Sequence, residues 1–118
     1  DDADISWLPA LTSLQYLDLR QNQLTQLQAL TGLTRLSVLL LDDNDLTDTA
    51  LLSPLTQLAN LWLTNNRLTT IALPNLTALQ DLRVGNNCLT SAPIVPATAV
   101  VTGITPQRSL LNGVCPAL

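Results

Sequence analysis

The densest group of side chains that could perform chemistry is the acidic run Asp-Asp-Asn-Asp-Leu-Thr-Asp over residues 42–48. Closely spaced carboxylate and amide oxygens are the ligands that calcium prefers in proteins. The run lacks the glycine and the closing bidentate Glu of an EF-hand loop. A run of like charges is more often a solvated surface. We therefore expect Asp42, Asp43, Asp45 and Asp48 to form a solvated acidic rim without a bound metal.

Residue types that support catalysis are scarce in this chain. It has no His and no Lys, so a general base that could activate a Ser or Cys nucleophile is missing. It also has no phosphate-binding loop and no GxGxxG dinucleotide fingerprint. We expect no enzymatic activity and no cofactor.

The chain has two cysteines, Cys88 and Cys115. A bridge between them would close a loop of about 28 residues and contribute roughly 3 to 4 kcal/mol in the loop-entropy view. The alternative is a pair of free thiols. We expect the disulfide, which implies an oxidising compartment: a secreted, cell-surface or periplasmic location.

An eleven-residue motif occurs four times in the chain, and its copies contain most of the acidic run as well as Cys88. It starts at Leu14, Leu36, Leu58 and Leu79, so its periods are 22, 22 and 21 residues. Each copy reads LxxLxLxxNxL, with Val84 in place of the third leucine of the last copy. A fixed period of this size is typical of a stacked solenoid. The period-two alternation inside each copy predicts a short strand whose leucines are buried.

An asparagine follows each predicted strand. Its carboxamide can donate to and accept from backbone groups where the chain turns. Stacking of the repeats would align these side chains into a structural ladder formed by Asn22, Asn44, Asn66 and Asn87.

The repeated motif resembles that of the leucine-rich repeat family, specifically the 22-residue type of bacterial internalins. The resemblance covers roughly residues 5–90. It implies an α/β repeat solenoid, curved, with a short parallel β-sheet on the concave side and 3₁₀ or irregular turns on the convex side. Leucines at intervals of three between the motifs, such as Leu27, Leu30 and Leu33, suit 3₁₀ turns.

Three segments follow from the limits of the repeats. Residues 1–13 are expected to form a partial repeat that caps the N-terminal end; the alternative is a fragment cut from a longer array. Residues 14–90 hold the four repeats. The period fails over residues 91–118, where prolines predict an irregular C-terminal cap, and residues 99–104 are β-prone enough for an edge strand.

Strand residues that point away from the leucines form the predicted concave face. Its two central columns contain Tyr16, Val38, Asn60 and Asp81 in the first and Asp18, Leu40, Trp62 and Arg83 in the second. We expect Leu40 and Trp62 to be exposed and in contact, because neighbouring parallel strands lie about 4.8 Å apart. An apolar centre with a charged rim is typical of a protein-binding surface. The eight residues are therefore the predicted partner-binding site.

Composition argues against other classes of partner. The net charge of −4, with only 5 basic residues, disfavours nucleic acid. No apolar run approaches the roughly 18 residues of a membrane-spanning helix. We expect a non-catalytic, extracellular protein-binding module of bacterial type. The alternative is a structural subunit of an extracellular or cell-surface assembly, which self-associates through its N-terminal end.

Overall fold

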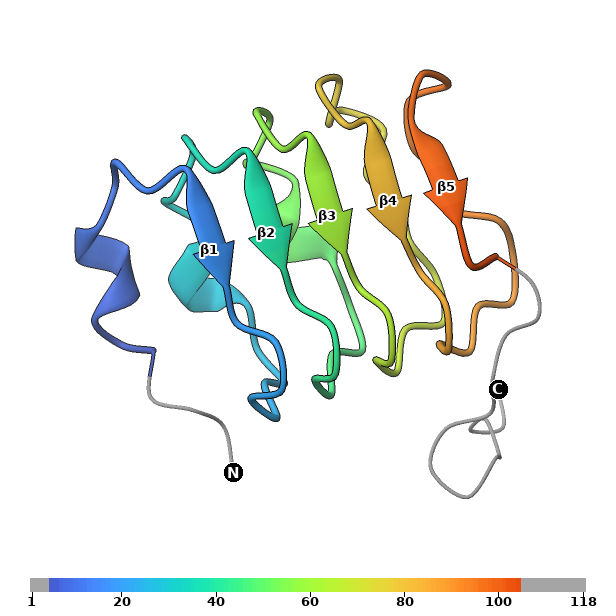
Figure 1. The fold of residues 1–118 in the computed structure, drawn as a ribbon, viewed down its shortest axis with the longest axis horizontal. Helices are drawn as coiled ribbons and strands as arrows, with labels where there is room; N and C mark the ends of the chain where they lie inside the picture. Colours follow the sequence, from blue (N-terminus) through green and yellow to red (C-terminus); the bar gives the residue numbers. More distant parts are fainter. Residues whose placement is uncertain (1–4, 105–118) are drawn as a thin grey trace.

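Coils of the chain stack side by side in the computed structural model, which describes residues 5–104 and places five strands there in one parallel sheet (Figure 1). The strands are β1 (Tyr16–Asp18), β2 (Val38–Leu40), β3 (Asn60–Trp62), β4 (Asp81–Arg83) and β5 (Val100–Thr102). Their order in the sheet is their order in the chain. This arrangement confirms the predicted repeat solenoid with a short parallel sheet. No helix in the described part of the chain is long and apolar enough to cross a membrane.

Short 3₁₀ helices form part of the return segments on the side opposite the sheet: η1 (Leu8–Ala10), η2 (Gln28–Leu30) and η3 (Ala50–Leu52). Each buries one leucine against the core. The leucine spacing of three fits this geometry, because the Leu30 amide donates to the carbonyl of Leu27 at 3.0 Å. The return over residues 69–79, which belongs to the repeat of period 21, has no 3₁₀ helix.

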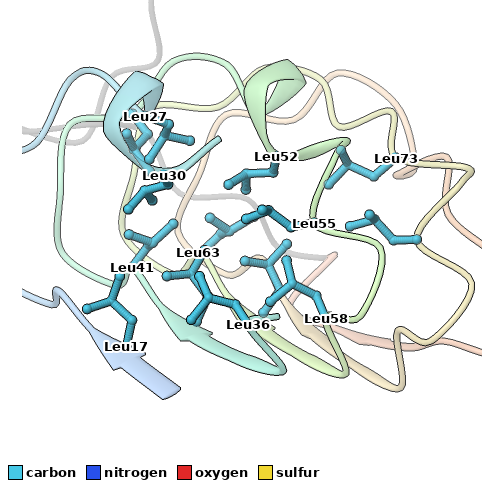
Figure 2. Packing of buried hydrophobic residues seen from close by; sticks show 14 of the residues in the cluster. Leu17, Leu27, Leu30, Leu36, Leu41, Leu52, Leu55, Leu58, Leu63 and Leu73 are labelled. Atoms are coloured by element: carbon cyan, nitrogen blue, oxygen red, sulfur yellow. The ribbon is translucent and has the colours of Figure 1, made fainter. Parts of the chain in front are cut away.

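The core is a continuous leucine layer between the sheet and the return segments. Figure 2 shows leucines of the return side, such as Leu30 and Leu52, and of the strand side, such as Leu36 and Leu58, filling this layer. All four are fully buried. Full burial of one such side chain contributes roughly 1.5 to 3 kcal/mol. Leu14, at the start of the first repeat, is only partly buried.

The carboxamide of Asn44 joins two successive coils. Its Oδ1 accepts from the backbone amides of Asn22 at 3.1 Å and Leu24 at 2.9 Å. Its Nδ2 donates to the carbonyls of Leu19 and Leu41, each at 3.0 Å. One buried side chain thereby satisfies backbone groups that would otherwise lack partners in the turns.

Asn66 and Asn87 make the same kind of bridge one and two coils further on. Asn66 accepts from the Leu46 amide and Asn87 from the Leu68 amide, both at 3.1 Å. Asn22 is half-buried, and its Nδ2 donates to carbonyls of its own coil. The structure therefore places all four asparagines in the turns after their strands, with the inter-coil bonds beginning at Asn44.

The sheet continues one strand past the fourth repeat. The amide of Val84 donates to the carbonyl of Thr102 at 2.9 Å, and β5 pairs in parallel with β4. The predicted edge strand within residues 99–104 is confirmed. This part of the segment expected to be irregular is regular sheet, because β-branched residues 100–102 fit a pleated strand. Residues 105–118 lie outside the described part.

Two glycines allow this last strand to approach. Gly103 has a φ of +86°, and a Cβ there would lie 2.4 Å from the Gly85 backbone nitrogen. Both the left-handed conformation and the close approach favour glycine.

Candidate functional site

The sheet register aligns the predicted binding residues as two columns on the concave face. The first column pairs Tyr16 with Val38, Val38 with Asn60, and Asn60 with Asp81. The second pairs Asp18 with Leu40, Leu40 with Trp62, and Trp62 with Arg83. The structure thus brings together all eight residues that the sequence analysis selected.

Leu40 differs from its expected state. It is 3% exposed, so the expectation of an exposed leucine at the centre of the face is wrong. Its register partner Trp62 is half-buried. Leu40 therefore presents little surface to a partner, although strand alternation places it on the concave face in register with the larger Trp62.

Arg83 is the register partner of Trp62 on β4. Its guanidinium Cζ lies 3.9 Å from the centroid of the indole ring, within the range of a cation–π contact. Its Nη2 also lies 3.2 Å from a carboxylate oxygen of Asp81. The Trp62 Nε1 is buried and has no hydrogen-bond partner among residues 5–104. In the sheet register, Trp62 therefore stands between Leu40 on β2 and Arg83 on β4, and the Arg83 guanidinium lies over its ring.

Exposed apolar surface lies towards the N-terminal side of the face. Tyr16 is 58% exposed, and its register partner Val38 is half-buried. The strand of Val38, β2, adjoins β3, which carries Trp62, while β1 with Tyr16 lies on the other side of β2. An aromatic side chain that is largely open to solvent can supply contact area with little loss of conformational entropy.

Asp18 and Arg20 form the shorter of the two ion pairs described on this face. Arg20 Nη2 donates to Asp18 Oδ2 at 2.8 Å, and Arg20 Nε donates to Oδ1 at 2.9 Å. These hydrogen bonds hold the pKa of the Asp18 carboxyl below its usual value. The two side chains form part of the wall of a polar depression. It is lined by Asp18, Arg20, Gln21, Asp42 and Asp43.

The acidic rim is only partly solvated. Asp42 is half-buried, and its Oδ1 accepts from the Thr64 amide at 2.8 Å. Burial raises the pKa of this carboxyl above its usual value. The expectation that all four rim carboxylates are solvated is therefore wrong at Asp42, because the next coil covers it.

The other rim residues also have structural contacts. Asp43 Oδ1 accepts from the Asn65 side-chain amide at 2.7 Å, and Asp48 Oδ1 accepts from the Ala50 amide at 2.8 Å. Asp45 is half-buried. Within residues 5–104, no three His, Cys, Asp or Glu side chains converge in a way that could hold a metal ion.

Cys88 belongs to the last repeat and is 4% exposed. Its backbone amide donates to the Leu68 carbonyl at 2.9 Å. Cys115 lies outside the described residues, so the bridge between the two cysteines stays a prediction.

Two groups on this face were absent from the predicted site. The first group is Arg20 and Gln21, which line the polar depression. They lie after the end of β1, whereas the predicted site contained only residues of the strands. Val100 and Thr102 extend the two columns onto β5, in register with Asp81 and Arg83. The β-prone composition of residues 99–104 was the available signal for the second group.

Comparison with known proteins points to one family. The leucine rich repeat family profile matches residues 1–46. Among solved structures, internalin C2 from Listeria monocytogenes is 29% identical, with a TM-score of 0.69, over 87% of this chain and 50% of that protein. Internalin F from the same species is 24% identical, with a TM-score of 0.60, over 83% of this chain and 43% of that protein. This chain spans about half the length of either. No curated protein sequence matched.

Proposed function

We propose that this chain, as a leucine-rich repeat protein of the internalin-like type, is a non-catalytic module that binds a protein partner through its concave face. The observation that carries this proposal is the row Leu40, Trp62 and Arg83 across β2, β3 and β4. Trp and Arg are the residue types most enriched in binding hot spots. Here both lie on the outward face of a sheet that is held rigidly by the leucine core.

The surroundings of this row favour a protein over a small molecule. Tyr16 and Val38 extend the apolar surface, while the pairs Asp18–Arg20 and Asp81–Arg83 border it with charge. An apolar centre inside a polar rim is the usual anatomy of a protein interface.

The proposed location is outside the cytoplasm: secreted, on the cell surface or in the periplasm. Support comes from the pair Cys88 and Cys115, since a disulfide in a small domain persists in oxidising compartments.

A second candidate function is a structural subunit that self-associates through the N-terminal end. The first coil carries Trp7 at 55% exposure and Leu11 at 43% exposure. Measurement of the solution mass over a range of concentrations separates this candidate from the first. A dimer that dissociates on Trp7→Ala would favour the second candidate, and a monomer favours the first.

The binding proposal is tested by comparing Trp62→Ala with the wild type in capture from host extracts and surfaces, followed by affinity measurement with the purified partner. Loss of the indole is expected to weaken binding by at least about 2 kcal/mol, or roughly 30-fold. Leu51→Ala is the matched control, because Leu51 is 42% exposed on η3, away from the sheet. Equal affinities for Trp62→Ala and the wild type would rule out the concave face as the binding site.

A further inference from the structure

The charges of the concave face are unevenly compensated. Arg20 is bonded to Asp18 at 2.8 Å, and Arg83 is bonded to Asp81 at 3.2 Å. Each guanidinium is therefore already neutralised by a carboxylate two residues away on its own coil. Neither pair therefore adds net positive charge to the face.

Asp42 and Asp43 form no salt bridge with an arginine of residues 5–104. They line the polar depression together with the Asp18–Arg20 pair and Gln21. Three carboxylates and one guanidinium around the depression give it a net charge of −2. The whole chain has a net charge of −4, so the residues outside the depression add a further −2 to this field.

Each of the two carboxylates has one oxygen held by a hydrogen bond from the next coil. The Thr64 amide holds one oxygen of Asp42, and the Asn65 side-chain amide holds one oxygen of Asp43. A partner that supplies a cation finds acceptors whose rotamers are already ordered, which lowers the entropic cost of binding.

Apolar surface lies on the same part of the sheet, at the other end of these strands. Asp42 and Asp43 follow β2, whose Val38 pairs with the exposed Tyr16 of β1. The depression therefore suits a basic head group, and the apolar columns suit an apolar side chain of the same segment.

We propose that the occupant of the concave face is a basic protein segment, with a Lys or Arg head group in the depression at Asp42 and Asp43 and an apolar side chain against Tyr16 and Trp62. This inference rests on the proposed function and specifies the chemistry of its partner. Charge complementarity across an interface selects partners and speeds their association. A second copy of the same face is disfavoured as the partner, because its carboxylates would repel those of the depression.

The test uses a phage-displayed random-peptide library, selected on the immobilised full chain and then sorted for clones that lose binding to Trp62→Ala. These clones are expected to contain Lys and Arg in excess over the starting library. A selected peptide should bind the double variant Asp42→Asn, Asp43→Asn at least about tenfold more weakly, which corresponds to about 1.4 kcal/mol. Added salt should weaken its binding to the wild type.

Asn preserves the acceptor oxygens for Thr64 and Asn65 and tolerates the left-handed backbone at Asp43, where φ is 61°. Asp45→Asn is the control, because Asp45 belongs to the same acidic run but does not line the depression. Asp45→Asn should change the affinity for the peptide by less than about twofold, because salt screens a charge that does not contact the bound head group. If the double variant does not fold, replacement of the peptide lysines by Gln tests the same contact on the wild type.

The outcomes separate the two proposals. Trp62-dependent peptides that are neutral or acidic, or that bind the double variant as well as the wild type, would overturn the basic partner and leave concave-face binding intact. Selected peptides that bind Trp62→Ala as tightly as the wild type, or the absence of any selected peptide, would count against both.

Discussion

The guanidinium of Arg83 lies over the indole of Trp62, with its Cζ 3.9 Å from the ring centroid. The contact joins β3 and β4 on the concave face, and the Arg83 Nη2 also lies 3.2 Å from a carboxylate oxygen of Asp81. The guanidinium shields one face of the aromatic ring from water, and the Trp62 side chain as a whole is half-buried.

Removal of this guanidinium should uncover the indole. In a Trp7→Phe background, where Trp62 is the only tryptophan, Arg83→Ala should increase quenching of the fluorescence by acrylamide. The free energy of unfolding should fall by only about 0.5 to 1 kcal/mol, the usual size of an exposed cation–π contact. Arg67→Ala is the control, since Arg67 is exposed and away from this ring. Identical quenching in both variants would contradict the stacked arrangement in solution.

Asn44→Ala should lower the free energy of unfolding by at least about 2 kcal/mol, because it leaves buried amides and carbonyls of two coils without partners. Asn22→Ala should cost less, since Asn22 is half-buried and its Nδ2 bonds stay within its own coil. Urea unfolding measures both. Gln57→Ala, at an exposed position, should have almost no effect. A ranking in which Asn44→Ala equals Gln57→Ala would refute the ladder.

Asp42→Asn should stabilise the protein at neutral pH. Burial raises the pKa of this carboxyl above its ordinary value of 3.8, so its ionisation is more costly in the folded than in the unfolded state. That cost is absent at a pH below the ordinary pKa, where the carboxyl is protonated in both the folded and the unfolded state. It is complete at a pH above the raised pKa of the folded state. Asn keeps the acceptor for the Thr64 amide.

Melting temperatures at about pH 3 and about pH 7 test this sign. The variant should exceed the wild type at the higher pH and match it at the lower. Asp45→Asn removes the same formal charge and controls for general repulsion. A stabilisation of equal size at both pH values would mean that ionisation of Asp42 is not its cause.

Gly103→Ala should destabilise the C-terminal edge of the sheet. The new Cβ would lie 2.4 Å from the Gly85 nitrogen, at a backbone φ of +86° that L residues rarely adopt. We expect a loss of at least about 2 kcal/mol from strain and displacement of β5. Gly32→Ala is the matched control, because nothing lies within 4 Å of a Cβ at that position. Hydrogen exchange at the Val84 amide, which bonds Thr102, should speed up in Gly103→Ala alone. Unchanged protection there would argue against the close glycine contact.

Cys88 and Cys115 should be joined in protein made in an oxidising compartment. Mass spectrometry without reductant should then find a peptide pair that links them and no alkylated thiol. Reduction should lower the free energy of unfolding by roughly 3 to 4 kcal/mol, as a loop of this length predicts. Ready alkylation of both residues in the native protein would remove the main support for the proposed extracellular location.

The repeated motif was enough to predict the fold and most of the local geometry. Leu17, Leu39, Leu61 and Leu82 occupy the same register of neighbouring strands, as the period required. The reason is physical: each coil can bury its leucines only against the next coil, so the sequence period fixes the stacking and the sheet register together. The turn asparagines follow from the same period, because their partners are backbone groups that every coil repeats.

Side-chain packing on the concave face did not follow from that period. Strand alternation places Leu40, Trp62 and Arg83 outwards, but the burial of Leu40 depends on the size and rotamer of its neighbour. The pairs Arg20–Asp18 and Arg83–Asp81 depend on side-chain rotamers within one coil. The partial burial of Asp42 depends on its contact with Thr64 of the next coil.

Sequence by itself therefore determined the repeat architecture, the leucine core, the turn asparagines and the two columns of outward residues. Only the tertiary structure decided which of those residues present their surface and which carboxylates lack a cation. The difference has a physical cause. Periodic features depend on backbone geometry that every coil shares, whereas exposure and charge balance depend on the particular side chains that stacking brings together.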